Sequence, residues 1–365
     1  MNHEIVKPTL VLDTDRARRN IHRMAEKARR QGVRLRPHFK THQSIAIGEW
    51  FRQAGVTAIT VSSQDMAEYF AGAGWEDITI AFPLNPRQIG AMSALGRSIR
   101  LGVLVESVES FAHSHGSLAA PLEVWIEVDE GSGRSGVAWN RENDLLEVAH
   151  TLKGIVPLQL KGLLTHSGRV YQAASPTEIC RIYRETVERL QYACQLLATR
   201  GFTGLEISVG DTPGCTLVDD FGAVDEIRPG NFVFYDVQQL QMGVCRFEEI
   251  ALAVACPVVA RHPERQEVVI YGGAIHLSKD TVTWEGQRTY GLVALATSQG
   301  WSNPLAGAFV ARLSQEHGVV HLPAGYFSQV QVGDLLYILP AHACLAVSAL
   351  REYHTLAGEK LAAMP

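Results

Sequence analysis

Short apolar runs alternate with amphipathic helical segments along the first two thirds of the chain. The stretches between the runs, such as residues 176–200, repeat apolar residues at intervals of three and four, which is typical of helices with one buried face. Eight apolar runs occur, at residues 33–39, 58–62, 78–82, 100–105, 122–128, 158–165, 205–209 and 226–234. The alternation predicts an α/β protein whose eight βα units form a (β/α)8 TIM-type barrel.

Beyond about residue 243 the pattern changes to short β-like segments bounded by Gly, Pro or polar turns. Such segments occur at residues 251–260, 267–270, 319–322 and 334–339, and no long helix separates them. We therefore expect a barrel domain over residues 14–242 and a second, mostly β C-terminal domain over residues 243–365. The strand at residues 9–12 could belong to either domain, and we assign residues 1–13 to the second.

Composition and charge exclude several classes of protein. The chain has 365 residues, 46% hydrophobic and 19% charged, a balance typical of a globular protein with one large and one smaller domain. A formal net charge of -5 argues against a nucleic-acid partner, because binding phosphates needs a basic surface. We interpret Arg29, Arg30, Arg34 and Arg36 as the end of a solvated helix.

Membrane and secretory signals are not found in the sequence. No apolar run reaches the roughly 18 residues that a membrane span needs, and residues 1–10 lack the apolar core of a signal peptide. The six cysteines show no CxxC spacing, so we expect reduced thiols. A cytoplasmic protein without a membrane partner is expected.

Polar residues follow several of the predicted strands, where barrels of this type carry their chemistry. Lys40 closes the first run in the sequence RPHFKTH, and a lysine amine at the barrel mouth can attack an aldehyde. A surface lysine is the alternative for Lys40 taken alone. After the fifth run, Arg134 lies among glycines and could reach an anionic oxygen. After the sixth run, His166 and Tyr171 offer rings and polar atoms to a flat cofactor.

The seventh and eighth runs end in residues suited to bind a phosphate. Gly210, Thr212 and Tyr235 supply a close backbone approach and hydroxyl groups. Asp211 fits only if its carboxylate points away, because it would repel a phosphate dianion.

One further cluster, PAHAC at residues 340–344, contains a candidate metal pair. If these residues form a strand, His342 and Cys344 project from one face and could ligate one divalent ion. Two protein ligands leave coordination positions open, which favours a catalytic metal. A buried structural His and Cys are the alternative.

Together these motifs resemble the fold-type III pyridoxal-phosphate enzymes of the D-threonine aldolase and D-serine dehydratase family, relatives of alanine racemase. The resemblance covers most of the chain, with its motifs in the family's order. RPHFKTH is similar to the family's Schiff-base motif, in which Lys40 falls on the lysine. The other matching segments are residues 208–213 (phosphate loop), 228–236 (RPGNFVFYD), 314–318 (SQEHG) and 340–344.

The resemblance implies two cofactors. Lys40 would bind pyridoxal 5'-phosphate as a Schiff base and then act as a general base. His342 and Cys344 would hold a divalent metal, with zinc expected and manganese or magnesium as alternatives. The other implied ligands of pyridoxal phosphate are Arg134, His166, Tyr171, Gly210, Asp211, Thr212 and Tyr235. Gln315, Glu316 and His317 are candidates for substrate binding.

The metal motif also bears on the reaction. Aldolases of the family tend to carry HxD, whereas dehydratases carry HxC, so Cys344 implies a D-serine dehydratase-like lyase. Such an enzyme eliminates water from a D-3-hydroxy amino acid and yields a 2-oxo acid and ammonia. The family also suggests a homodimer.

Other activities stay open. The nearest is retro-aldol cleavage to glycine and an aldehyde. A racemase would need a second base, such as His317, and non-catalytic pyridoxal-phosphate carriers lack the β domain. Residues 271–280 are distinctive, but the pattern assigns them no role.

Overall fold

The computed structural model describes residues 5–111, 118 and 120–365, which form two compact units. Unit 1 comprises residues 1–22, 41–50 and 231–365, and unit 2 comprises residues 23–40 and 51–230. Residues 1–4 of the expected segment 1–13 lie outside the described residues.

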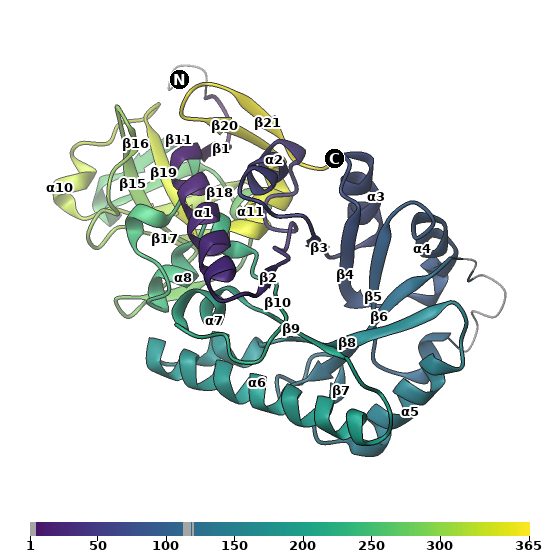
Figure 1. Ribbon diagram of the computed structural model, residues 1–365. Coiled ribbons are helices and arrows are strands. Elements are labelled where there is room, and N and C mark those ends of the chain that lie inside the picture. Colours follow the sequence, from purple (N-terminus) through teal and green to yellow (C-terminus); the bar gives the residue numbers. More distant parts are fainter. Residues whose placement is uncertain (1–4, 112–117, 119) are drawn as a thin grey trace. The chain divides into compact units, whose positions relative to one another are not determined.

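Unit 2 contains the predicted barrel. Its parallel strands follow the order β2-β10-β9-β8-β6-β5-β4-β3, and a parallel bridge between His38 and Thr60 joins the two ends of this order (Figure 1). The strands are β2 (Arg34–Leu35), β3 (Ile59–Val61), β4 (Asp77–Pro83), β5 (Arg100–Val105), β6 (Leu122–Asp129), β8 (Leu158–His166), β9 (Glu206–Gly210) and β10 (Glu226–Ile227), and β7 (Val137–Ala138) pairs with β6. The fold expected from the alternating pattern is confirmed.

Helices connect the barrel strands, and side-chain hydrogen bonds fix the starts of α3 (Gln64–Gly72) and α6 (Pro176–Thr199). The hydroxyl of Ser63 accepts from the Met66 amide at the start of α3, and Ser175 does the same for Glu178 at the start of α6. Inside the ring, Leu104, Trp125 and Leu164 form a buried cluster. The helices are α1 (Thr14–Arg30), α2 (Ile45–Gln53), α3 (Gln64–Gly72), α4 (Ile89–Leu95), α5 (Glu142–Lys153), α6 (Pro176–Thr199) and α7 (Thr212–Leu217).

The interpretation of the arginine cluster as a solvated helix end is confirmed for Arg29 and Arg30, which are exposed in the last turn of the first helix, but was wrong for Arg34 and Arg36. Helix α1 ends at Arg30, and Arg36 is only 2% exposed. The Arg36 guanidinium lies 2.6 Å from the Glu226 carboxylate and 2.5 Å from the Asp77 carboxylate. These carboxylates offset the desolvation cost of the buried guanidinium.

The eighth strand is shorter than its apolar run. Strand β10 covers only Glu226–Ile227, and Asn231–Val233 forms a 3-10 helix. Pro229 has no amide hydrogen for a sheet ladder, so pairing stops there. The remaining apolar residues of the run are nevertheless buried.

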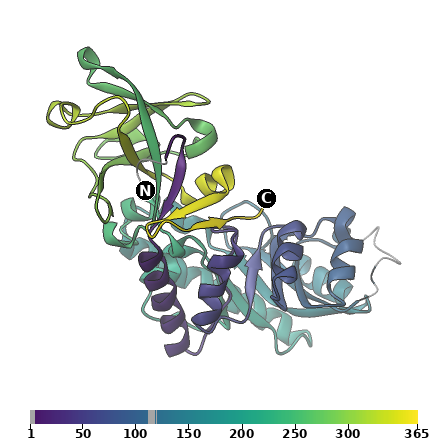
Figure 2. The same cartoon turned by 90° about the horizontal axis from the view of Figure 1, so that it is seen from above.

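Unit 1 is built around a mostly antiparallel sheet (Figure 2). Strand β1 (Thr9–Leu12) pairs with β11 (Leu252–His262) and β20 (Glu352–Thr355) and so belongs to this sheet. The strand order is β12-β18-β17-β15-β19-β11-β1-β20-β21, and an additional pairing of β12 with β11 closes part of it into a barrel.

The remaining elements of unit 1 have the following bounds. The strands are β11 (Leu252–His262), β12 (Glu267–Tyr271), β13 (Val282–Trp284), β14 (Gln287–Thr289), β15 (Gly291–Thr297), β16 (Gly300–Trp301), β17 (Phe309–Leu313), β18 (His317–His321), β19 (Leu335–Pro340), β20 (Glu352–Thr355) and β21 (Lys360–Ala362). The helices are α8 (Val237–Gln241), α9 (Ala274–Leu277), α10 (Ala324–Phe327) and α11 (Ala343–Leu350).

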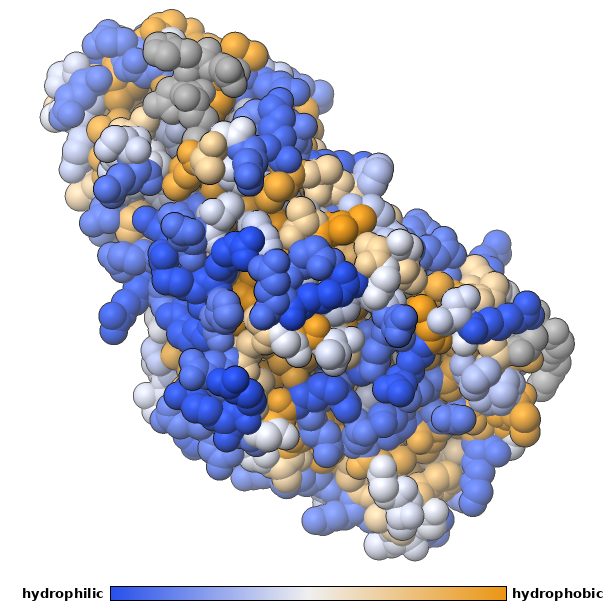
Figure 3. All heavy atoms as spheres, turned by 45° about the horizontal axis from the view of Figure 1, so that its top comes forward, coloured by the Kyte–Doolittle hydropathy of each residue, from blue (hydrophilic) through white to orange (hydrophobic). Residues whose placement is uncertain are grey.

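The surface is mainly hydrophilic on the face drawn in Figure 3, with hydrophobic side chains interspersed. This pattern is expected where amphipathic helices turn their polar sides outward. Among the described residues, no helix has the length and apolar character required to cross a membrane.

Candidate active site

The segment that carries Lys40 is anchored by the residue before it. Phe39 is fully buried, and its ring centroid lies 5.1 Å from that of Phe51, 4.9 Å from Phe70 and 5.1 Å from Trp75. The amide of Phe39 also donates to the Thr60 carbonyl at 2.8 Å. This packing fixes the backbone on both sides of Phe39, where His38 and Lys40 line a pocket.

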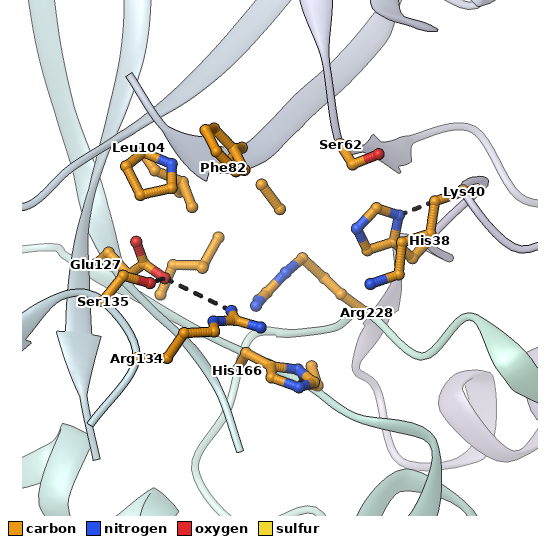
Figure 4. A pocket seen from close by; sticks show the side chains of 14 residues that line it. His38, Lys40, Ser62, Phe82, Leu104, Glu127, Arg134, Ser135, His166 and Arg228 are labelled. Atoms are coloured by element: carbon orange, nitrogen blue, oxygen red, sulfur yellow. Dashed lines mark hydrogen bonds and ion pairs between the residues drawn. The ribbon is translucent and has the colours of Figure 1, made fainter. Parts of the chain in front are cut away.

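The pocket lies entirely within unit 2 and has a volume of about 380 Å³. Figure 4 shows Lys40, His38, Arg228, His166 and Arg134 around an open space, with Phe82 and Leu104 across it. The full lining consists of His38, Lys40, Ser62, Ala81, Phe82, Pro83, Leu104, Glu127, Arg134, Ser135, Leu164, His166, Gly210 and Arg228.

A carboxylate stands beside the cationic groups of the pocket. Glu127 accepts a hydrogen bond from the Ser135 hydroxyl at 2.9 Å and lies 3.9 Å from the Arg134 guanidinium. Burial raises the pKa of Glu127, and its Oε2 atom is buried without a hydrogen-bond partner. An unpaired buried oxygen in a pocket lining is available to a ligand.

His166 and Arg228 are held by the ends of neighbouring strands. His166 Nδ1 lies 2.7 Å from the carbonyl oxygen of Gly210, and burial lowers the pKa of His166 to about 3. The imidazole is therefore neutral, its Nδ1 donates, and its Nε2 is left as an acceptor. Arg228 donates to the Thr165 carbonyl at 2.7 Å and to the Ser208 hydroxyl. Burial lowers the pKa of Arg228 to about 10, which leaves it cationic near neutral pH.

The expected phosphate ligands are only partly brought together. Gly210 lines the pocket, whereas Asp211, Thr212 and Tyr171 lie outside its lining, and Tyr235 belongs to unit 1. The Asp211 carboxylate caps helix α7 by accepting from the Gly214 amide. Because burial raises the pKa of Asp211 to about 7, its repulsion of an anion is reduced.

The other three residues have structural contacts of their own. The Thr212 hydroxyl accepts from the Gly230 amide at 3.3 Å, and the Tyr171 ring lies 5.9 Å from the His166 ring. Tyr235 is buried and has a left-handed backbone, with φ 49°.

The residues of the pocket fit pyridoxal 5'-phosphate. Lys40 supplies an amine, Arg134 and Arg228 supply charges that match a phosphate or carboxylate, and Leu104 and Leu164 offer an apolar wall to a flat ring. A Cβ at Gly210 would lie 3.0 Å from Arg228 Nη2, so a larger residue there would disturb the cation.

The expectation that His342 and Cys344 share one face of a strand was wrong. Strand β19 ends at Pro340, His342 is the residue before helix α11, and Cys344 is the second residue of that helix. The Asp236 carboxylate accepts from the Ala343 amide at 3.0 Å and so fixes the start of the helix. The two side chains still come within hydrogen-bonding reach of each other.

Unit 1 surrounds the Cys344 sulfur with polar groups. Cys344 Sγ lies 3.4 Å from the Thr41 hydroxyl and 3.8 Å from the Asn231 amide nitrogen. Asn231 Nδ2 also donates to Asp236 at 2.6 Å, and Asn231 Oδ1 is buried without a hydrogen-bond partner. A thiolate at Cys344 would therefore be close to hydrogen-bond donors.

This donor set fits a divalent ion with open coordination positions. An imidazole and a thiolate are ligands suited to zinc. Among the described residues, no group of three or more His, Cys, Asp and Glu side chains is arranged to hold a metal. Two protein ligands alone would leave coordination positions for water or substrate.

The candidate substrate residues lie at the turn between β17 and β18. Gln315 and His317 are exposed, and Glu316 Oε2 lies 3.7 Å from His276 Nε2. His276 belongs to the 271–280 segment that the sequence left without a role. The same segment contributes Asp280, whose Oδ2 lies 2.8 Å from His342 Nδ1.

Sequence reasoning missed Glu127, Arg228 and Asp280. Glu127 had a usable signal, because it lies two residues after Trp125 on β6 and therefore faces the same side, toward the C-terminal strand end. In the sequence, Arg228 is distinguished only as the first residue of the RPGNFVFYD segment. Asp280 is 62 positions from His342, and no local pattern predicts such a contact.

Comparisons with known proteins agree with this architecture. Residues 12–237, more than half of the chain, match the family of the alanine racemase N-terminal domain, and residues 251–356 match a serine dehydratase domain.

Individual relatives extend over nearly the whole chain. D-threo-3-hydroxyaspartate dehydratase of Delftia sp. strain HT23 is 32% identical, over 96% of this chain and 94% of that protein. D-serine dehydratase of Dictyostelium discoideum is 28% identical, over 95% of this chain and 92% of that protein. A solved structure of D-threo-3-hydroxyaspartate dehydratase, a cysteine-to-alanine mutant in the metal-free form, matches with a TM-score of 0.91 and 30% identity, over 100% of this chain and 98% of that chain.

The barrel fold, the pocket that contains Lys40 and the similarities over nearly the whole chain all indicate the same family. The chain belongs to the alanine racemase-like family of pyridoxal-phosphate enzymes that includes D-threo-3-hydroxyaspartate dehydratase, D-serine dehydratase and D-threonine aldolase.

Proposed function

We propose that this protein is a pyridoxal-phosphate- and metal-dependent lyase that eliminates water from a D-3-hydroxy amino acid. The products are a 2-oxo acid and ammonia. The observation that carries the proposal is the imidazole and thiol pair of His342 and Cys344, within hydrogen-bonding reach of each other at the start of α11. The dehydratase names of two full-length relatives support the same chemistry.

In this proposal Lys40 and its neighbours serve the cofactor. Lys40 would hold pyridoxal 5'-phosphate through Nζ, with Arg134, His166 and Gly210 as further ligands and Arg228 added from the pocket lining. When bound, the cofactor supplies an electron sink for charge that develops at the substrate α-carbon.

Different residues of the pocket transfer the proton, bind the substrate carboxylate and orient the ligand. Once the substrate amine has displaced Lys40 from the cofactor, the freed Lys40 Nζ would take the α-proton of the substrate as general base. Arg134, whose side chain is 61% exposed, can turn toward a carboxylate and bind it with two parallel hydrogen bonds. His166 is neutral, and its Nδ1 donates to the Gly210 carbonyl. Its Nε2 is therefore the atom that can accept a hydrogen bond from a bound ligand and orient it.

The metal pair serves the leaving group. His342 and Cys344 would hold the ion, with zinc proposed and manganese or magnesium as alternatives. A divalent ion supplies Lewis acidity toward the departing hydroxyl oxygen, which is otherwise a poor leaving group. Support comes from the relative whose cysteine-to-alanine mutant was solved in a metal-free form.

We also propose that Tyr171, Asp211, Thr212 and Tyr235 help to bind the cofactor, and that the enzyme works as a homodimer. Exposed apolar side chains support an interface in unit 1, where Ile275 on α9 is 47% exposed and Leu345 on α11 is 40% exposed. Helices α9 and α11 pack against each other, so these two residues lie on adjoining elements.

A product assay tests the reaction. Holoenzyme is incubated with D-threo-3-hydroxyaspartate, D-serine, D-threonine or D-3-phenylserine, with added divalent metal or with a chelator. We expect ammonia and a 2-oxo acid in equal amounts from at least one substrate. We also expect chelation to stop turnover while the cofactor absorption persists, because the Lys40 pocket contains neither metal ligand.

The other outcomes identify the alternatives. Glycine plus an aldehyde would mean retro-aldol cleavage, and loss of optical activity without either product set would mean racemisation. No turnover of any D-amino acid would favour a carrier. The L-enantiomers and a Lys40→Ala variant are the controls.

A further inference from the structure

The imidazole of His342 has a carboxylate partner on one of its two nitrogens. Asp280 Oδ2 lies 2.8 Å from His342 Nδ1, and both residues belong to unit 1. The Asp280 side chain is 51% exposed and the His342 side chain 32% exposed, so the contact is reachable from solvent. Because Nδ1 is engaged, Nε2 is the nitrogen left to ligate an ion.

Asp280 is held in place by the 271–280 segment. After β12 the chain follows the turn between β17 and β18, with the Gly272 amide donating to the Glu316 carbonyl at 3.0 Å and the Ala274 amide to the Ser314 carbonyl at 2.8 Å. A Cβ at Gly273 would lie 2.3 Å from the Gln315 carbonyl oxygen, so only glycine permits this approach.

The end of the segment is fixed equally closely. Ser278 has a positive φ of 69°, and its hydroxyl accepts from the Asp280 amide at 3.2 Å. This turn follows helix α9 directly. The position of the Asp280 carboxylate therefore depends on the packing of the whole segment.

We infer that Asp280 is a positioning residue for the metal site, and that the 271–280 segment holds its carboxylate beside His342. The inference rests on the proposed function, in which His342 and Cys344 hold a divalent ion. A carboxylate on the distal nitrogen of a ligating histidine fixes the tautomer and the ring orientation and increases the ligand's basicity. Removing such a partner typically weakens metal affinity about 10-fold to 100-fold.

The partner of His342 Nδ1 is the Asp280 carboxylate, at 2.8 Å. The Asp236 carboxylate is already occupied by the Ala343 amide and by Asn231, and it fixes the backbone of the pair instead. Asp280 thus aims the imidazole, while Asp236 sets where helix α11 begins.

The inference is tested by measuring Zn²⁺ and Mn²⁺ binding to the cofactor-loaded enzyme by calorimetry, for the wild type and for Asp280→Asn and Asp280→Ala. We expect the dissociation constant to rise about 10-fold to 100-fold in Asp280→Ala. Asp280→Asn should lie between, because it keeps an acceptor and loses the charge. Glu359→Gln, which neutralises an exposed carboxylate of the same unit, is the matched control and should bind like the wild type.

Turnover and folding give independent readings. At saturating metal the variants should recover most of the wild-type kcat, and their cofactor absorption and thermal midpoint without metal should be unchanged. Wild-type metal affinity in a folded Asp280→Ala would overturn the role of Asp280. If the wild type itself binds neither ion, the metal part of the proposed function fails instead.

Discussion

At the scale of single residues, burial decides what the ionisable groups of the pocket region can do. Lys40 and Asp211 illustrate the difference in what sequence can predict. Lys40 was found because it belongs to a motif at a strand end. The role of Asp211 was not foreseen, since its raised pKa depends on tertiary burial and on the Gly214 amide that it caps.

Asp211 makes a pH-dependent contribution to stability that a single substitution removes. Burial raises the pKa of Asp211 to about 7 from an ordinary 3.8, so the folded protein binds this proton more tightly than the unfolded chain. The contribution is fully present below pH 3.8 and is lost as the pH rises through 7. Asp211→Asn keeps a capping oxygen but has no carboxyl proton to lose. The free energy of unfolding of the variant minus that of the wild type should therefore increase by up to about 1.4 kcal/mol per pH unit between pH 5 and 7. Urea denaturation at pH 5, 6, 7 and 8 measures this, and parallel curves for the two proteins would contradict the buried proton.

At the scale of elements, periodicity predicted strands and helices well and their junctions poorly. The eight barrel runs have the correct order, yet the run at 226–234 holds a strand of only two residues, because Pro229 interrupts pairing. The sequence pattern predicts a strand at His342 and Cys344. In the structure helix α11 begins at Ala343 instead, because the Asp236 carboxylate caps the Ala343 amide and the following residues favour a helix. Junctions depend on such distant caps, which a local pattern does not contain.

The join of β2 and β10 depends on a buried ion pair. Burial would raise the pKa of Glu226, but Arg36 and Arg34 outweigh it and hold the pKa at about 2. Glu226→Gln should lower the free energy of unfolding by about 3–5 kcal/mol, because the buried Arg36 guanidinium loses one of its carboxylate partners. Glu123→Gln, beside the 63% exposed Arg100, should cost less than about 1 kcal/mol. Equal losses in the two variants, measured by urea denaturation at pH 7, would refute a special role for Glu226.

At the scale of the whole molecule, each unit brings one set of reactive groups. Unit 2 provides the Lys40 pocket, and unit 1 provides His342, Cys344 and Asp280. The two-part pattern in the sequence predicted an α/β barrel and a β-rich part. It could not predict that residues 41–50 would cluster with the β-rich part, since this depends on long-range contacts such as that of the Tyr353 hydroxyl with the His42 carbonyl.

That Lys40 carries the cofactor in the unit 2 pocket is tested most directly by reducing the loaded enzyme with borohydride, digesting it and locating the label by mass spectrometry. The label is expected on the peptide containing Lys40, and Lys40→Ala should show neither the label nor the visible absorption of the bound cofactor. Stoichiometric label on another lysine, or retained reducible absorption in Lys40→Ala, would contradict this placement.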